Sequence, residues 1–362
     1  MSRINLLSAS LARALGGLVL ACSSGLAGAR AADPEVKTVN ESRKGSVQTV
    51  DNITVTRLKV DAKELVGCML WADKEGKAFF TLDTNGVVRK ISFPELVEEQ
   101  RLDLEAKCSW LSPAPEGLLV TVSGKGEVLQ LAENLAASRT FKIAGVRRAV
   151  STPAMPLGIA GTGEAWYILD LKKGGRPISH RAPGAGIHFE SVTMTPDGKW
   201  VLATNGGRVM RFGFTLASYL KGSWSGPDIA DHASRICLSP DGKHVALPCG
   251  GGNHTGLKLH PEVKSYSTYV YPVNDLGKPA FALESGAYPH MVGFDPVGGN
   301  VFAQNSDHQL IVFTYAGIKK KEYKIDRRGT DVKQYLAHPS GNKLLLLTEQ
   351  TLALVELPAS DK

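Results

Sequence analysis

A short phrase recurs along the chain, and it consists of an apolar run, a tight turn related to Pro-Asp-Gly-Lys, and a second apolar run. It is clearest at 192–204 and 236–247, and it returns at 292–303 and 335–347. In such a turn Pro presets φ, Asp bonds to its own backbone and Gly accepts the positive φ of a strand reversal. The repeat predicts the architecture before any single residue is considered, because each unit needs its neighbours to bury its apolar face.

The spacing of the turns predicts the fold. Every step is 40 to 44 residues except for one of 56, and the turn positions are Asp73, Pro113, Pro153, Pro196, Pro240, Pro296 and Pro339. A pitch of about 40–45 residues is typical of a four-stranded propeller blade. We therefore predict an all-β, seven-bladed β-propeller at residues 51–358, with blades at roughly 61–104, 105–143, 144–182, 183–222, 230–283, 287–326 and 331–358.

Single strands can also be predicted. In the fourth unit we expect strands at 191–194, 200–204, 209–214 and, outermost, 218–222. The last unit is one strand short, and 52–60 is a β-rich run with no other place in the repeat. We expect 52–60 to complete the seventh blade and close the ring, because a propeller otherwise leaves an unpaired edge.

The N-terminus has the pattern of an export signal. Arg3 and Arg13 both precede an apolar stretch at 14–21. Ala29-Arg-Ala31 fits a cleavage site for a signal peptidase. We predict a signal peptide at 1–31, a periplasmic or extracellular protein, a polar linker at 32–50 and a short tail at 359–362. Val19-Leu-Ala-Cys22 also resembles a bacterial lipobox, so lipidation of Cys22 and membrane anchoring stay open. No segment is long enough for a transmembrane span.

Composition excludes some partners. Cleavage after Ala31 removes three arginines and no acid, which lowers the net charge from +7 to +4. No basic stripe with interleaved aromatic residues is present, so nucleic-acid binding is not predicted. Lys319-Lys-Lys321 is interpreted as the solvated edge of an outer strand.

The cysteines leave two interpretations. The mature chain holds Cys68, Cys108, Cys237 and Cys249, without a Cys-x-x-Cys pair that would indicate zinc or redox chemistry. A disulfide between Cys68 and Cys108 is conceivable in an oxidising compartment, whereas the alternative is buried thiols that pack as small apolar groups. Pairing of Cys237 with Cys249 is left open.

These motifs resemble a known superfamily. Ser239-Pro-Asp-Gly-Lys243 is similar to the turn phrase of WD40 and YVTN-type β-propellers, and Gly286-Ala-Tyr-Pro-His290 is similar to a phrase of YVTN and bacterial lactonase-type repeats. The Gly-His and Trp-Asp pairs of WD40 proper are absent. The resemblance covers nearly the whole mature chain, and it implies binding on one face of the ring. That face, here called the channel-mouth face, carries the loops from second to third strands and from each outer strand to the next inner strand.

Candidate binding residues lie in loops of the channel-mouth face. The long step in the repeat marks an insertion at 250–264, which is either a binding loop or a neutral surface insertion. The candidate binding residues are Asn205, Arg208, Asp231, His232, Asn253, His254, Tyr288, His290, Asn305, Asp307 and His308.

Other residues receive structural roles. Trp71, Trp110, Trp166 and Trp200 are expected to pack between blades, whereas Trp224 lies in a Gly/Ser-rich segment and is a candidate exposed contact. The histidines show no metal-ligand spacing, so we predict no metal and no cofactor.

Two functional classes are considered ahead of a third, a metal or redox-cofactor propeller. The leading hypothesis is an exported, non-catalytic binding or scaffold propeller of the bacterial cell envelope, with a protein or envelope ligand as partner. It rests on the blade count, the export signal and the lack of a nucleophile elbow, phosphate loop or catalytic triad in the sequence. The alternative is a lactonase-type or related sugar-acid hydrolase, in which His290, Asp307 and His308 supply acid–base groups.

Overall fold

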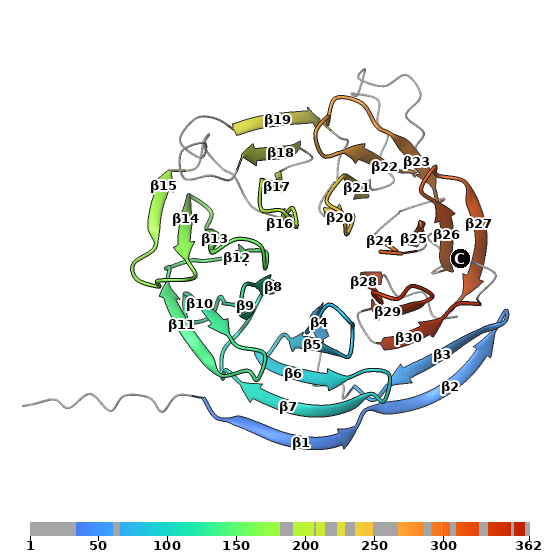
Figure 1. The fold of residues 1–362 in the computed structure, drawn as a ribbon, viewed down its shortest axis with the longest axis horizontal. Coiled ribbons are helices and arrows are strands. Elements are labelled where there is room, and N and C mark those ends of the chain that lie inside the picture. Colours follow the sequence, from blue (N-terminus) through green and yellow to red (C-terminus); the bar gives the residue numbers. More distant parts are fainter. Residues whose placement is uncertain are drawn as a thin grey trace, which may run out of the picture. The chain divides into compact units, whose positions relative to one another are not determined.

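The computed structural model describes residues 34–60, 66–181, 191–205, 208–213, 223–228, 236–248, 267–285, 291–297, 299–304, 309–325, 332–348 and 351–358. Within these ranges the chain forms antiparallel sheets that follow one another around a central axis (Figure 1). The predicted seven-bladed β-propeller is confirmed.

Each blade runs from an innermost strand to an outer one. The first three blades contain β4 (Val66–Trp71), β5 (Ala78–Asp83), β6 (Val87–Ser92) and β7 (Val97–Asp103); β8 (Trp110–Ala114), β9 (Gly117–Val122), β10 (Glu127–Leu131) and β11 (Ala137–Lys142); and β12 (Arg148–Val150), β13 (Leu157–Gly161), β14 (Ala165–Asp170) and β15 (Ile178–Arg181).

The next three blades contain β16 (Ser191–Met194), β17 (Trp200–Asn205), β18 (Arg208–Gly213) and β19 (Ser223–Asp228); β20 (Cys237–Leu238), β21 (His244–Pro248), β22 (Ser267–Pro272) and β23 (Phe281–Glu284); and β24 (Val292–Phe294), β25 (Asn300–Gln304), β26 (Gln309–Thr314) and β27 (Lys319–Lys324). The seventh contains β28 (Val332–Ala337), β29 (Lys343–Thr348), β30 (Leu352–Glu356) and the N-terminal β3 (Ile53–Leu58).

The ring closes as predicted. Strand β3 pairs antiparallel with β30, with Val55 opposite Val355 and Thr56 opposite Leu354. Ile53 and Val55 are fully buried in the core shared with the C-terminal blades. The first and last segments of the propeller are therefore held in one sheet, so that no blade is left a strand short.

The predicted linker at 32–50 is wrong. It contains β1 (Val36–Ser42), which pairs with β7 as a fifth strand of blade 1, and β2 (Lys44–Val50), which pairs with β3 as a fifth strand of blade 7. Most of their side chains are exposed or half-buried. Outer strands of this kind have a polar sequence because neither face enters a core, and the same sequence is typical of a linker.

Between these two strands, Arg43 is buried in a charged cluster. Its Nε donates to Oε2 of Glu98 at 2.6 Å, while Nε of Arg101 donates to the other oxygen at 2.6 Å. Arg89 lies 3.7 Å from the same carboxylate and bonds Asp83 at 2.9 Å. Glu98 is fully buried, so the N-terminal ribbon is fixed to blade 1 by a desolvated ionic network.

The repeated turns have the expected chemistry. In blade 4, Thr195 Oγ1 donates to Asp197 Oδ1 at 2.6 Å, the Lys199 amide donates to the same oxygen at 3.1 Å, and Gly198 has φ of 70°. Ser239 and Asp241 repeat the arrangement in blade 5. Burial raises the pKa of Asp197, but the hydrogen bonds from Thr195 and Lys199 outweigh burial and leave this pKa lowered.

Two predicted positions shift. In blade 2, Ala114 pairs with Gly117, so the turn comprises Pro115 and Glu116 and lies beyond Pro113. The outermost strand of blade 4 is 223–228 instead of 218–222, and it places Trp224 in a strand opposite Arg211. Gly and Ser in a polar outer strand give the same local signal as a loop, which explains why the outermost strand of blade 4 was predicted at the wrong residues.

Apolar residues fill the space between neighbouring blades. Trp166 of blade 3 is fully buried, and its ring centroid lies 4.5 Å from that of Phe212 in blade 4. This confirms the predicted role of Trp166 in packing between blades. Lys319 and Lys320 are exposed on outer strand β27, as predicted for a solvated edge.

Candidate functional site

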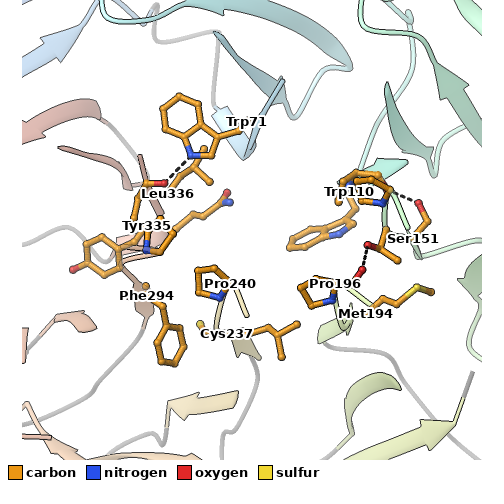
Figure 2. Close-up of a pocket in the computed structure, with 18 of the residues that line it drawn as sticks. Trp71, Trp110, Ser151, Met194, Pro196, Cys237, Pro240, Phe294, Tyr335 and Leu336 are labelled. Carbon is orange, nitrogen blue, oxygen red and sulfur yellow. Dashed lines mark hydrogen bonds between the residues drawn. The ribbon is translucent and has the colours of Figure 1, made fainter. Parts of the chain in front are cut away.

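The innermost strands enclose a central cavity of about 1020 Å³. Every blade contributes to its wall, and Figure 2 shows Trp110, Met194, Pro196, Pro240 and Phe294 around an open centre. The positions of the repeated turns also line it, namely Asp73, Pro113, Pro115, Pro153, Pro196, Pro240, Pro296 and Pro339. The repeat that specifies the blades therefore also gives this cavity a collar of prolines.

The cavity has two chemically different ends. At the starts of the innermost strands, toward the channel-mouth face, lie Arg148 and Lys333. At the other end, here called the turn face, the charged lining residues are Asp73, Lys74, Glu75 and Glu133. Among the described lining residues, the charged side chains toward the channel-mouth face are thus basic, whereas three of the four toward the turn face are acidic.

Arg148 is stacked on an aromatic ring. Its guanidinium carbon lies 4.6 Å from the centroid of Trp110, which belongs to the neighbouring blade. Cation–π contact of this kind is strengthened where water is excluded. Trp110 therefore joins blades as predicted, and it also forms part of the cavity wall, which the sequence analysis did not foresee.

The junction of blades 7 and 1 is held by directional bonds. Gln334 accepts from the Met69 amide and donates to its carbonyl, both at 2.8 Å. Trp71 Nε1 donates to the Ala337 carbonyl at 2.8 Å (Figure 2). His338 stacks on Phe93 with centroids 4.7 Å apart. Burial lowers the pKa of His338, and the nearby Lys343 adds to this effect.

The thiols of blades 1 and 2 are buried and not joined by a disulfide. Burial raises the pKa of Cys68 to about 11, with the Cys68 thiol donating to the Leu111 carbonyl. Burial, with a contribution from Asp83, raises the pKa of Cys108 to about 12. Both side chains belong to one buried apolar cluster with Leu111 and Val120, which confirms the interpretation as apolar packing groups for this pair. Cys22 and Cys249 lie outside the described residues.

The candidate binding residues of the channel-mouth face are only partly placed. Asn205 ends β17 and pairs with Arg208 at the start of β18, at the end of the blade opposite its turn. This places the backbone of both residues on the predicted face. The remaining candidates and the insertion lie outside the described residues: Asp231, His232, Asn253, His254, Tyr288, His290, Asn305, Asp307, His308 and 250–264.

Within the described ranges, no group of three or more His, Cys, Asp or Glu side chains is arranged to hold a metal ion. The same part of the chain contains no helix with the length and apolar character of a membrane span.

The sequence analysis missed the cavity wall. Trp110 and Arg148 each lie five residues before the turn of their blade, at Pro115 and Pro153, and this equal spacing was the available signal. The prediction of Pro113 as the turn of blade 2 conceals this equal spacing. The apolar members Met194, Leu238 and Phe294 each lie two residues before the turn of their blade and share one level of the wall.

Comparison with known proteins supports the fold alone. No protein-family model and no curated protein matches the sequence. The chain is structurally similar to the β-propeller domain of Cps50 (Swd1) from Myceliophteria thermophila, with a TM-score of 0.64 and 13% identity over 83% of this chain and 98% of that one. Because 1532 chains of solved structures match, the fold by itself selects no particular ligand.

Proposed function

We propose that this protein is an exported binding or scaffold propeller of the bacterial cell envelope, which recognises a protein or envelope ligand on its channel-mouth face. The observation that carries this proposal is the closed seven-bladed ring, which is similar to WD40 propellers and therefore to a fold often used for binding. A rigid ring presents loops at fixed positions, and binding residues concentrate on such loops.

The N-terminal strands are compatible with export. Strand β1 begins at Val36, so cleavage after Ala31, or before Cys22, leaves every strand of the described residues in place. Fractionation of cells and the intact mass of the mature chain test this part of the proposal. We expect a mature chain that begins at Ala32, and full-length protein retained in the cytoplasm would contradict export.

The binding face can be tested within single blades. A photocrosslinking amino acid at Asn205 or at the exposed Glu164, in the loops between second and third strands, should capture one common partner in intact cells. The same group at exposed Lys199, in the turn of blade 4, should not capture it. Capture from Lys199 with equal yield, or different products from Asn205 and Glu164, would contradict the proposed face.

Affinity then provides the quantitative test. Replacing Arg208, His254 and His290 together by Ala should weaken binding of the captured partner by at least about tenfold. The melting temperature should change by only a few degrees, because these residues are assigned to loops and strand ends. Unchanged affinity would remove these residues from the site.

A further inference from the structure

The outer edge of blade 7 is open along one strand. Strand β2 is the fifth strand of this blade and lies on the outer rim of the ring, with β3 as its one neighbour in the sheet (Figure 1). Within the described residues, no backbone hydrogen bond reaches residues 45–50 from outside the pair with β3. Such an edge presents unpaired N–H and C=O groups to any strand that aligns with it.

The hairpin between β2 and β3 determines which backbone groups face this edge. Its turn consists of Asp51 and Asn52, with φ of 46° and 68°, and two positive φ values are characteristic of a type I′ turn. Val50 and Ile53 flank the turn and are paired. In a two-residue hairpin this flanking pair exchanges both of its hydrogen bonds, and the orientation of the backbone groups then alternates along each strand.

Val47 and Thr49 consequently direct their backbone N–H and C=O groups away from the blade. Gln48 lies opposite Val55 and repeats the orientation of Val50, so the residues on either side of Gln48 have the opposite one. The Val47 side chain is 54% exposed, and Thr49 is exposed as well. The edge therefore combines two outward donors and two outward acceptors with β-branched side chains, which favour strand pairing.

Strand β2 lacks the charges that protect the other edges. Among the described strands, the outermost strand of every other blade carries charged residues: Lys37 and Glu41 on β1, Arg139 and Lys142 on β11, Arg181 on β15, Asp228 on β19, Glu284 on β23, and the lysines of β27. On β2 the one charge, Lys44, and a register shift before Val47 are confined to the start, and 45–50 is uncharged. Charges and bulges discourage edge pairing, so 45–50 is the least protected edge of the described ring.

A second copy of the same strand fits this edge in a symmetric register. Identical antiparallel strands are related by a twofold axis, and an axis at Gln48 places Val47 of each copy opposite Thr49 of the other. Both residues direct N–H and C=O outward, so each of these two pairs exchanges hydrogen bonds across the interface. This register uses the regular part of the strand, beyond the shift between Lys44 and Val47. It also brings no like charges opposite each other, because 45–50 carries none.

We propose that the protein forms a twofold homodimer through its β2 strands, which joins blade 7 of both copies into one continuous antiparallel sheet. Six residues of each copy bury less area than a standard interface of about 1,200–2,000 Å², so the dimer dissociates on dilution, with a Kd on the order of micromolar or weaker. The contact lies on the rim and uses none of the residues assigned to the channel-mouth face. Failure of either proposal therefore leaves the other intact.

Sedimentation equilibrium over a range of protein concentrations tests the dimer. Wild-type protein should show a reversible monomer–dimer equilibrium. Thr49→Pro removes an outward N–H and keeps the bonds to β3, because proline is tolerated where the N–H of an edge strand faces solvent. It should weaken the dimer by at least about tenfold, with a melting temperature within a few degrees of wild type. A wild-type protein that stays monomeric at every concentration, or a Thr49→Pro variant that dimerises normally, would overturn the proposal.

A charge placed on the edge provides a matched comparison. Val47→Lys should weaken the dimer by at least about tenfold, because a lysine on an edge strand opposes pairing. Ile178→Lys makes the same kind of change on the outer strand β15, at a side chain that is 50% exposed, and should dimerise as wild type. Equal weakening by the two variants would assign the effect to net charge and contradict a contact through β2.

Disulfide trapping tests the register and does not depend on a variant that weakens the dimer. In a Cys22→Ser, Cys249→Ser background, Gln48→Cys places two thiols at the twofold axis, where residues of a non-hydrogen-bonded pair have Cα atoms about 4.5 Å apart. Mild oxidation should convert it to a covalent dimer. Ser46→Cys, exposed on the same strand, lies opposite Val50 of the second copy, so its two Cα atoms are about 14 Å apart, too far for a disulfide. Equal crosslinking of the two variants, or none of Gln48→Cys, would contradict this pairing.

Discussion

The junction between blades 7 and 1 is held differently from the junction between blades 3 and 4. At the first, Gln334 bonds both backbone groups of Met69, and the N-terminal ribbon crosses from blade 1 to blade 7. At the second, Trp166 packs on Phe212, and Thr152 Oγ1 donates to the Pro196 carbonyl at 2.9 Å.

This difference follows from chain connectivity. Blades 3 and 4 are consecutive in sequence, and they are held by apolar packing together with the Thr152 hydrogen bond. Blades 7 and 1 are far apart in sequence, and bringing them together costs loop-closure entropy. Directional hydrogen bonds, shared strands and buried charges at this junction fix the register of closure.

The largest expected effect comes from removing the closing strand. Deletion of residues 51–60 removes the buried Ile53 and Val55 and leaves β30 as an unpaired edge. We expect a loss of more than about 5 kcal/mol in the free energy of unfolding, which is the whole stability of a marginal domain. Denaturant titration measures it, with Val47→Ser, at an exposed site on β2, as a near-neutral control. An unaltered unfolding curve would show that β3 does not close the ring.

The buried charge cluster should give the next largest effect. Glu98→Ala leaves Arg43 without its buried carboxylate and Arg89 with Asp83 alone, and it should cost about 3–5 kcal/mol. Glu99→Ala removes the neighbouring carboxylate, whose pair with Lys90 is half-buried and solvent-accessible, and should cost less than about 1 kcal/mol. Equal costs for these adjacent residues would mean that the cluster does not anchor the N-terminal ribbon.

A smaller effect should separate the two junctions directly. Gln334→Ala leaves the Met69 amide and carbonyl without their partner and should cost about 2 kcal/mol. Hydrogen exchange at the Met69 amide should become faster in this variant. Phe212→Leu at the other junction should cost about 1 kcal/mol and leave that amide unchanged. Faster Met69 exchange in both variants would argue against separate junctions.

The smallest effect is a pH dependence at the closing junction. The folded state lowers the pKa of His338 through burial, so the unfolded chain binds this proton more readily. The contribution of His338 to stability is therefore complete above its unfolded pKa of about 6.5 and is lost as the pH falls through the lower folded value. His338→Phe keeps an aromatic ring against Phe93 and should reduce the slope of stability below about pH 6.5. An unchanged slope would assign the dependence to other groups.

Most of the fold could be predicted because its signals are local. Thr195, Asp197 and Gly198 specify their turn with bonds among neighbours in sequence, so repetition reveals the blades. Strands β1 and β2 could not be predicted, since they pair through their backbones and expose most side chains. The burial of Arg43 depends on Glu98, 55 positions away, and no local pattern records it.

The candidate sites also divide into a part that the sequence predicts and a part that depends on contacts between blades. Loops of the channel-mouth face were predicted from topology, because alternate strand connections lie on one side of a propeller. The stacked pair of Arg148 and Trp110 was not, since it forms between adjacent blades whose alignment depends on the exact turn of blade 2. A shift of two residues, from Pro113 to Pro115, was sufficient to conceal it.

The most direct test of the proposed function is in-cell crosslinking of wild-type protein beside a variant lacking residues 251–263. Melting curves of both proteins establish that the ring is intact in the variant. We predict that wild type captures a defined partner and that the deletion abolishes this capture while the melting temperature stays within a few degrees. The same partner captured with equal yield by the deletion variant, or no partner captured by wild type, would contradict a binding function on the channel-mouth face.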